Sequence, residues 1–447
     1  MKLILRNLFL WIALLLSLTV QAKNSPFFSS TDYVKALKKV TDIMVNDVTS
    51  PVSASRYYAY LTISANEVLA GLSKDGANSF LTQLNGFKQI DVTQLPNNEN
   101  NKEFSTILMV FKMGEKLLPS GYLLKKQIDS LLVVAAKKGI SKTTINNSVA
   151  YVDAVVQKML PYIKSDGFAS LSNLRRYTPV NGDAYWQPTQ PAFMAPVEPH
   201  WNSLKTFILD SAQQFKPLPP AVYDTNTTSV YFRQLKEVYD ISKRANAEKN
   251  AIAMFWDCNP FAVQQMGHVQ YGLKKISPGG HWIGITGIAC IIKKYSLQKT
   301  VQVHALVSVV LADAFLACWD EKYRSNRVRP ETAINKLIDH RWHPLLQTPP
   351  FPEYVSGHSV ASTAAASVLT KIFGENFSFN DNTEVEFELP VRKFKSFNAA
   401  AAEAAISRLY GGIHYRDAID EGVWQGRKVG EYSLMKLNNY LKMISTQ

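Results

Sequence analysis

Three short clusters in the C-terminal half share a content of cations, histidines and small residues. In chain order they contain Trp319, Lys322 and Arg329; Ser356, Gly357 and His358; and Arg408 and His414. Arginine binds oxyanions through its planar fork of donors, and lysine adds a compact positive charge. One imidazole can act as a nucleophile or ligand, and the other as an acid or base. The set is therefore typical of a site for a tetrahedral oxyanion.

The first cluster lies at the end of a predicted buried helix, Leu306–Tyr323, which is rich in Ala, Val and Leu. A continuous helix would place Lys322 and Arg329 on one face, about two turns apart. Pro330 disfavours that continuity, and the alternative is that Arg329 projects from a turn. Taken alone, two cations at a helix end are also explained by favourable interaction with the helix dipole.

The second cluster precedes a predicted helix over Ser359–Phe373. Ser356 and Gly357 would stand at its N-terminus, where free backbone N–H groups and the positive dipole end favour an anion. His358 would lie in the first turn. Taken alone, the motif is also explained by a serine N-cap followed by an incidental histidine.

The third cluster follows a predicted helix over Ala399–Arg408. The pair Gly411-Gly412 is expected to stop or bend this helix, which could bring Arg408 and His414 onto one site. Taken alone, the pattern is also explained by a simple helix C-cap with Arg and His on the surface.

Composition and other motifs limit the function classes. Apolar residues make up 46% of the 447 residues, which excludes a disordered chain. The net charge of +13 indicates either a basic surface or an anionic substrate or cofactor. No basic run is interleaved with aromatics, so nucleic-acid binding is not predicted. A carboxylate pair for glycoside hydrolysis, a G-x-S-x-G elbow, a Walker loop and an H-E-x-x-H motif are not found.

The three cysteines, Cys258, Cys290 and Cys318, leave at least one unpaired within the chain. Their spacing does not predict a zinc or redox motif, and it does not predict any pairing. Cys318 lies in an apolar helical run and is interpreted as a small buried hydrophobe.

Hydrophobic periodicity predicts an all-α fold of two helical bundles in one globule, with the anion site in the C-terminal bundle. The further predicted helices are 31–44, 55–72, 103–118, 123–138, 143–160 (ended by Pro161) and 229–253. The proline-rich stretch Tyr177–Pro199 is predicted to be an extended linker. The short alternating stretch Glu384–Leu389 is charged and is predicted to be a loop.

The N-terminus is typical of a secretory signal peptide, residues 1–22. Lys2 and Arg6 are followed by the apolar run Leu8–Leu18 and by small residues around Ala22. A helical N-terminal domain over 23–200 and a C-terminal domain over 230–447 are predicted to follow. The expected location is periplasmic or secreted, with no stable membrane span after signal cleavage.

The three clusters resemble the motifs shared by vanadium-dependent haloperoxidases and type 2 phosphatidic acid phosphatases. The matching residues are Lys322-x6-Arg329-Pro330, Ser356-Gly357-His358 and Ser407-Arg408-x5-His414. The resemblance covers the C-terminal domain. Further segments are similar to the bacterial haloperoxidase branch: Phe255-Trp256, Ser277–Trp282, and the linker with Trp186, Pro188, Pro191, Pro199 and Trp201. Length and leader resemble periplasmic flavobacterial vanadium iodoperoxidases.

This resemblance implies a role for each site residue. His414 would be the axial ligand of vanadate, and His358 an acid or base beside the axial oxygen. Trp319 would line the pocket. The equatorial oxygens would be held by Lys322, Arg329, Arg408, Ser356 and the amide of Gly357. Hydrogen peroxide would oxidise a halide to hypohalous acid without a change in the oxidation state of vanadium. Iodide and bromide are the halides expected as substrates.

The same residues would serve a secreted acid phosphatase acting on a small phosphomonoester. His414 would attack phosphorus to give a phosphohistidine, and His358 would protonate the leaving oxygen. Two departures bear on this alternative: Val355 replaces a proline, and Ala418 replaces the Asp that would orient the histidine, unless a one-residue adjustment lets Asp417 serve. Trp319 and the wider match favour the peroxidase. A non-enzymatic oxyanion binder is the third hypothesis, and the sequence predicts neither halide preference nor oligomeric state.

Overall fold

The computed structural model describes residues 26–73, 79–87, 95, 99–244, 246–266 and 268–446. The predicted signal peptide, residues 1–22, lies outside this range. Helices hold 61% of the described residues and strands only 3%, so the all-α prediction is confirmed.

The N-terminal half consists of long helices joined by short 3₁₀ turns. Its helices are α2 (Ser30–Asn46), α3 (Pro51–Gly71), α4 (Lys102–Leu117), α5 (Lys125–Lys137) and α6 (Lys142–Lys164), with turns η1 (Phe80–Gln83), η2 (Gly121–Leu124), η3 (Phe168–Asn173) and, farther along, η4 (Trp201–Ser203). Most begin at a Ser or Asn whose side chain accepts a backbone N–H of the first turn, as at Ser29, Asn101 and Ser141. Each predicted helix of this half is present within about one turn of its expected ends.

The C-terminal half adds nine helices and two short hairpins among the described residues. The helices are α7 (Val230–Lys243), α8 (Ala247–Phe255), α9 (Pro278–Ile292), α10 (Leu297–Ser325), α11 (Pro330–Leu337), α12 (Gly357–Phe373), α13 (Phe397–Tyr410), α14 (Arg416–Lys436) and α15 (Asn438–Thr446). The hairpins pair β1 (Val263–Met266) with β2 (Val269–Gly272), and β3 (Phe379–Asp381) with β4 (Arg392–Phe394), both antiparallel. Sequence periodicity missed these strands because three or four residues are too few to show alternation. Between β3 and β4, the predicted loop contains one 3₁₀ turn, η5 (Val385–Phe387).

Two predicted helix boundaries are wrong. Pro161 lies inside α6, which continues to Lys164. Pro161 and Gln157 are both exposed, so the carbonyl that loses its helical partner can bind water. The predicted helix 229–253 is divided into α7 and α8, because Asn246 caps α8 by accepting from the Lys249 N–H at 2.9 Å.

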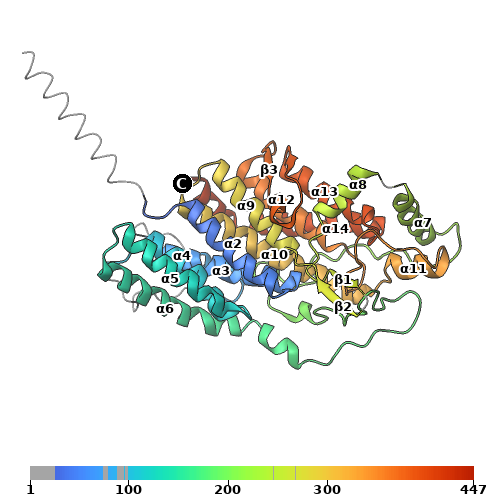
Figure 1. The fold of residues 1–447 in the computed structure, drawn as a ribbon, viewed down its shortest axis with the longest axis horizontal. Helices are drawn as coiled ribbons and strands as arrows, with labels where there is room; N and C mark the ends of the chain where they lie inside the picture. Colours follow the sequence, from blue (N-terminus) through green and yellow to red (C-terminus); the bar gives the residue numbers. More distant parts are fainter. Residues whose placement is uncertain are drawn as a thin grey trace, which may run out of the picture.

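Helix α10 forms the centre of the molecule and packs against α3, α9, α12 and α14 (Figure 1). Figure 1 shows α4, α5 and α6 at one end and α7 and α11 at the other. One contiguous apolar core contains residues of both halves. Among the described residues, α10 is also the one helix long and apolar enough to cross a membrane, and its apolar window is fully buried in the protein.

Two long-range contacts join segments that are far apart in the sequence. Near the C-terminus, Tyr440 of α15 packs its ring 4.3 Å from that of Phe80 and donates its hydroxyl to Asn66 at 3.0 Å. The proline-rich segment is non-helical between η3 and η4, as predicted. It lies against the end of α10 that carries Trp319 and Tyr323. The carbonyl of Val197 accepts from Trp319 Nε1 at 3.2 Å and from Tyr323 Oη at 2.6 Å. The division of the chain into domains at 200–230 stays a prediction.

Candidate active site

The structure brings the three clusters together at the ends of α10, α12 and α13. Five residues of the clusters line one small cavity together with the nearby Phe351: Trp319, Gly357, His358, Arg408 and His414. Lys322, Arg329 and Ser356 are fully buried behind this lining. All the predicted site residues therefore belong to one region, although they span almost one hundred positions of the chain.

Lys322 organises the loop that leads into α12. Its Nζ donates to the carbonyls of Pro352, Glu353 and Val355, at 3.2, 3.1 and 2.5 Å. Burial lowers the pKa of Lys322 to about 8, because desolvation disfavours the charged form. At neutral pH the ammonium is still mostly protonated, and its charge lies directly behind the N-terminus of α12.

Arg329 does not share a helical face with Lys322. Helix α10 ends at Ser325, Asn326 adopts a left-handed conformation with φ 47°, and Arg329 becomes the N-cap of α11 with Pro330 in its first turn. The Arg329 guanidinium donates to Phe351 O and Ile413 O, both at 2.9 Å, and Nη1 lies 3.2 Å from His414 Nε2. Its buried Nη2 has no partner among the described residues. Burial lowers the pKa of Arg329 to about 10.

The start of α12 presents Ser356, Gly357 and His358 as predicted. Ser356 is the N-cap and accepts from Ser359 N at 3.3 Å. A Cβ added at Gly357 would lie 3.7 Å from Trp319, an ordinary contact, so packing alone does not require glycine. Its bare Cα borders the cavity, where it allows close approach of a ligand to the backbone.

His358 contributes a buried ring nitrogen to the cavity. Its Nε2 has no partner among the described residues. The pKa of His358 lies well below its usual range, first because of burial and then because of the positive charge of Arg408. The imidazole is therefore neutral at neutral pH and can accept a proton.

Arg408 lies in the last turn of α13, which ends at the glycine pair as predicted. A Cβ at Gly411 would lie 2.5 Å from Leu346 Cδ1, and Gly412 has φ 78°. Arg408 donates through Nη2 to the carbonyls of Trp256 and Ala253, at 2.6 and 3.2 Å. The alternative of a surface Arg and His is excluded, because Arg408 and His414 are both buried.

A glutamate orients His414. Glu353 Oε1 lies 2.8 Å from His414 Nδ1 and accepts from Tyr415 N at 3.0 Å. The proposal that Asp417 performs this role is wrong, because Asp417 Oδ1 instead accepts from Arg327 Nη1 at 2.6 Å. Glu353 was missed because it precedes the histidine by 61 positions, and only the fold joins the two.

Burial, neighbouring charges and the contact with Glu353 together determine the protonation state and tautomer of His414. Burial and then the charge of Arg329 and Lys322 hold its pKa well below the usual range, so the ring is neutral at neutral pH. With Nδ1–H donated to Glu353, the lone pair of Nε2 faces Arg329. His414 can therefore act as a ligand or nucleophile through Nε2. Among the described residues, Lys322, Arg329 and Arg408 form no ion pair with a carboxylate, so the site keeps excess positive charge.

Comparisons with known proteins agree with this geometry. A family model described as the VCPO second helical-bundle domain matches residues 338–443. None of the curated proteins searched matches the chain. Among solved structures, apo-type and holo-type bacterial vanadium-dependent chloroperoxidases match with TM-scores of 0.66 and 0.64 at 17% and 16% identity, covering 89% and 88% of this chain and 95% and 93% of theirs, which shows a common fold.

A solved structure described as the first bacterial vanadium-dependent iodoperoxidase is much more similar. It is 43% identical, with a TM-score of 0.85, and the alignment covers 93% of this chain and 98% of that one. Such identity over nearly the whole of both chains is enough to establish common descent, and the chain therefore belongs to the family of vanadium-dependent haloperoxidases.

Proposed function

We propose that this enzyme binds vanadate and uses hydrogen peroxide to oxidise iodide to hypoiodous acid, with bromide as a poorer substrate. The observation that carries the proposal is that three buried cations, none paired with a carboxylate among the described residues, surround neutral His414, with Arg329 Nη1 3.2 Å from its Nε2. Such a site stabilises a multiply charged oxyanion that also accepts a nitrogen ligand.

The residues present fit vanadate. Arg329 Nη2 and His358 Nε2 are buried without partners among the described residues. A bound oxyanion would accept a hydrogen bond from Arg329 Nη2 and could form a hydrogen bond with His358 Nε2. Gly357 leaves room beside the first amides of α12. His414 would be the ligand, and the oxygens would be held by Lys322, Arg329, Arg408, Ser356 and the Gly357 amide.

Bound vanadate would supply a Lewis-acidic centre that activates hydrogen peroxide towards halide. The protein residues would manage protons and charge around it. Neutral His358 would take a proton from incoming peroxide and return it to the departing oxygen as water forms. Glu353 would hold His414 in one tautomer, and the cations would stabilise negative charge on oxygen throughout.

Iodide is proposed as the preferred halide for two reasons. The similar solved protein is described as an iodoperoxidase. The cavity also presents the aromatic rings of Trp319, Phe351 and Phe315. An apolar, aromatic wall suits a large, weakly hydrated and polarisable halide better than a small one. Iodide is also easier to oxidise than bromide or chloride.

A phosphomonoesterase activity is the second candidate, because one observation favours it. The carboxylate of Glu353 gives His414 the oriented imidazole that a nucleophile needs, although the residue four positions after it is Ala418. The cations would then stabilise the phosphoryl oxygens, and His358 would protonate the leaving oxygen.

One pair of assays separates the two activities. The mature chain, freed of vanadium and phosphate, is assayed with and without orthovanadate for peroxide-dependent iodide oxidation and for p-nitrophenyl phosphate hydrolysis. We expect iodide oxidation only with vanadate and its loss in His414→Ala, whereas His343→Ala, which changes an exposed histidine, retains it. Phosphatase turnover without vanadate, inhibited by vanadate and without iodide oxidation, would reject the proposal.

Export to the periplasm or medium is proposed from residues 1–22 alone. Fractionation of cells expressing the full chain, with N-terminal sequencing of the product, tests it. An uncut N-terminus in the cytoplasm would contradict the proposal.

A further inference from the structure

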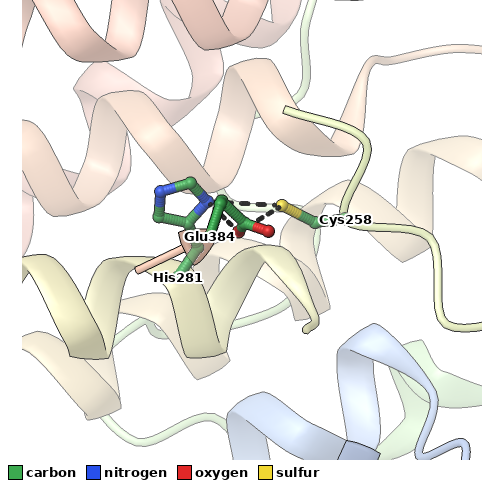
Figure 2. A group of neighbouring side chains, drawn as sticks. All are labelled: Cys258, His281 and Glu384. Carbon is green, nitrogen blue, oxygen red and sulfur yellow. Dashed lines mark hydrogen bonds and ion pairs between the residues drawn. The ribbon is translucent and has the colours of Figure 1, made fainter. Parts of the chain in front are cut away.

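A second group of buried polar side chains lies behind one wall of the active-site cavity. It consists of Cys258 in the loop after α8, His281 in the first turn of α9, and Glu384 just before η5 (Figure 2). Each side chain is buried, and Cys258 also borders the cavity. The three residues come from separate segments, so no local sequence motif marks them.

The ligand atoms of this group converge. His281 Nδ1 lies 3.0 Å from Glu384 Oε1 and 3.4 Å from Cys258 Sγ, and Sγ lies 3.9 Å from Oε1. A tetrahedral zinc ion with bonds of about 2.0–2.3 Å holds its ligand atoms roughly 3.3–3.6 Å apart. The three observed separations bracket that range, so a single ion can reach all three atoms with shifts of a few tenths of an ångström.

The outer contacts of His281 also suit a metal ligand. Its Nε2 lies 2.8 Å from Asp381 Oδ2, which leaves Nδ1 to face Cys258 and Glu384. Asp381 is held in turn by the N–H and hydroxyl of Thr383, at 3.0 and 2.7 Å. A histidine that ligates a metal through one nitrogen commonly donates the other N–H to a carboxylate, which fixes its orientation.

We propose that Cys258 Sγ, His281 Nδ1 and Glu384 Oε1 bind one zinc-class divalent cation, with a water in the fourth position. Binding displaces two protons to solvent: the thiol proton of Cys258, as the S–metal bond forms, and the proton between His281 Nδ1 and Glu384 Oε1, as the N–metal bond forms. A thiolate with an imidazole favours zinc over magnesium or calcium, which prefer oxygen ligands. The ion would balance the charges of the thiolate and Glu384, with Asp381 as the outer carboxylate.

The position of this site gives the ion a structural role. The indole of Trp256 stacks on the His281 ring with centroids 4.5 Å apart, and the Trp256 carbonyl accepts from Arg408. A metal that joins the three segments would therefore stiffen the wall that holds Arg408. The site is separate from the oxyanion ligands, so it stands or falls independently of the proposed activity.

Cobalt substitution of the full mature chain tests the site. The protein is stripped with a chelator, titrated with Co²⁺ and followed by absorbance, with metal content measured after dialysis. We expect one Co²⁺ per chain, a near-ultraviolet thiolate-to-cobalt band, and visible bands of tetrahedral intensity. Zn²⁺ should displace Co²⁺ and raise the Tm of the stripped protein.

Variants make the test specific. Cys258→Ser should abolish the thiolate band, and Glu384→Gln should weaken Co²⁺ binding at least 100-fold. Cys290→Ser changes another buried thiol, on the same helix as His281, and should leave both readouts unchanged. Circular dichroism confirms that each variant is folded, and Glu384→Gln replaces Cys258→Ser as the decisive variant if the latter does not fold. Absence of stoichiometric metal in the wild type, or an unchanged thiolate band in Cys258→Ser, would overturn the proposal. Vanadate binding measured on the same samples separates failure here from failure of the proposed function.

Discussion

Buried arginines of the N-terminal core and of the candidate active site have different kinds of partners. Arg56 on α3 pairs with the carboxylate of Asp166 at 2.7 Å, and burial alone would lower its pKa, but Tyr60 and Asp166 raise it above the usual value. In the active site, Arg329 and Arg408 donate mainly to backbone carbonyls, and burial lowers the pKa of both. A carboxylate-paired cation is electrically balanced and serves the fold. A cation held only by neutral acceptors keeps its charge for a ligand.

The largest predicted effect breaks the balanced pair. Arg56→Met leaves the buried Asp166 carboxylate, among the described residues, with only Tyr60 and the Phe168 N–H as donors. We expect the free energy of unfolding to fall by about 3–5 kcal/mol, measured by urea denaturation, with vanadate affinity of the folded protein unchanged. The double variant with Asp166→Asn removes both charges and should recover part of the loss. A full-stability Arg56→Met protein would contradict the comparison.

The converse change breaks the unbalanced cation. Arg329→Met should lower vanadate affinity about 10²–10³-fold, because a buried charged donor to the oxyanion is lost. Its stability without vanadate should stay equal or rise, since a desolvated charge is removed. Calorimetric titration and urea denaturation of one preparation measure both. Loss of stability comparable to that of Arg56→Met would show that Arg329 serves the fold instead.

A smaller effect is predicted for the carboxylate behind His414. Glu353→Gln should weaken vanadate binding about 10–100-fold, because the carboxylate fixes the tautomer and raises the basicity of Nε2. Asp417→Asn is the matched control, since Asp417 contacts Arg327 but not His414. Equal loss of affinity in both variants, with Tm unchanged, would assign the effect to Arg327 rather than to His414.

The smallest effect concerns pH. The pKa of Lys322 in the free site is about 8, because burial disfavours its charged form. A bound oxyanion stabilises that charge, so affinity should be constant below about pH 8 and fall by up to tenfold per pH unit above it. Tungstate is the suitable probe, since its charge is constant between pH 7 and 9.5. Lys322→Met should bind more weakly but without this slope, and a pH-independent wild type would refute the assignment.

The position of the candidate oxyanion residues in one region was predictable because each stands in a short local pattern. A cation near a helix end, a Ser-Gly-His at an N-terminus and a glycine pair before His414 each determine where a side chain points. Most helices were predictable for the same local reason. Where prediction failed, the cause was either a cap, as at Asn246, or a solvent-facing proline, as at Pro161.

Partners from distant segments could not be predicted in this way. The carboxylate partner of His414 was sought among residues that follow it in the next helix, but Glu353 in the loop before α12 provides it. The neighbours of Cys258 were not predicted, because cysteine spacing was the only signal considered and it does not point to His281 or Glu384. Both contacts depend on how loops meet in three dimensions, which one sequence does not contain.

The contact of α15 with the first half of the molecule has a consequence for the order of folding. Tyr440 completes the environment of Phe80 and Asn66, so that part of the core cannot form until residue 440 has been synthesised. Such long-range closure is slow compared with local helix formation. If residues 1–22 direct export, we expect this part of the core to form only after α15 has crossed the membrane.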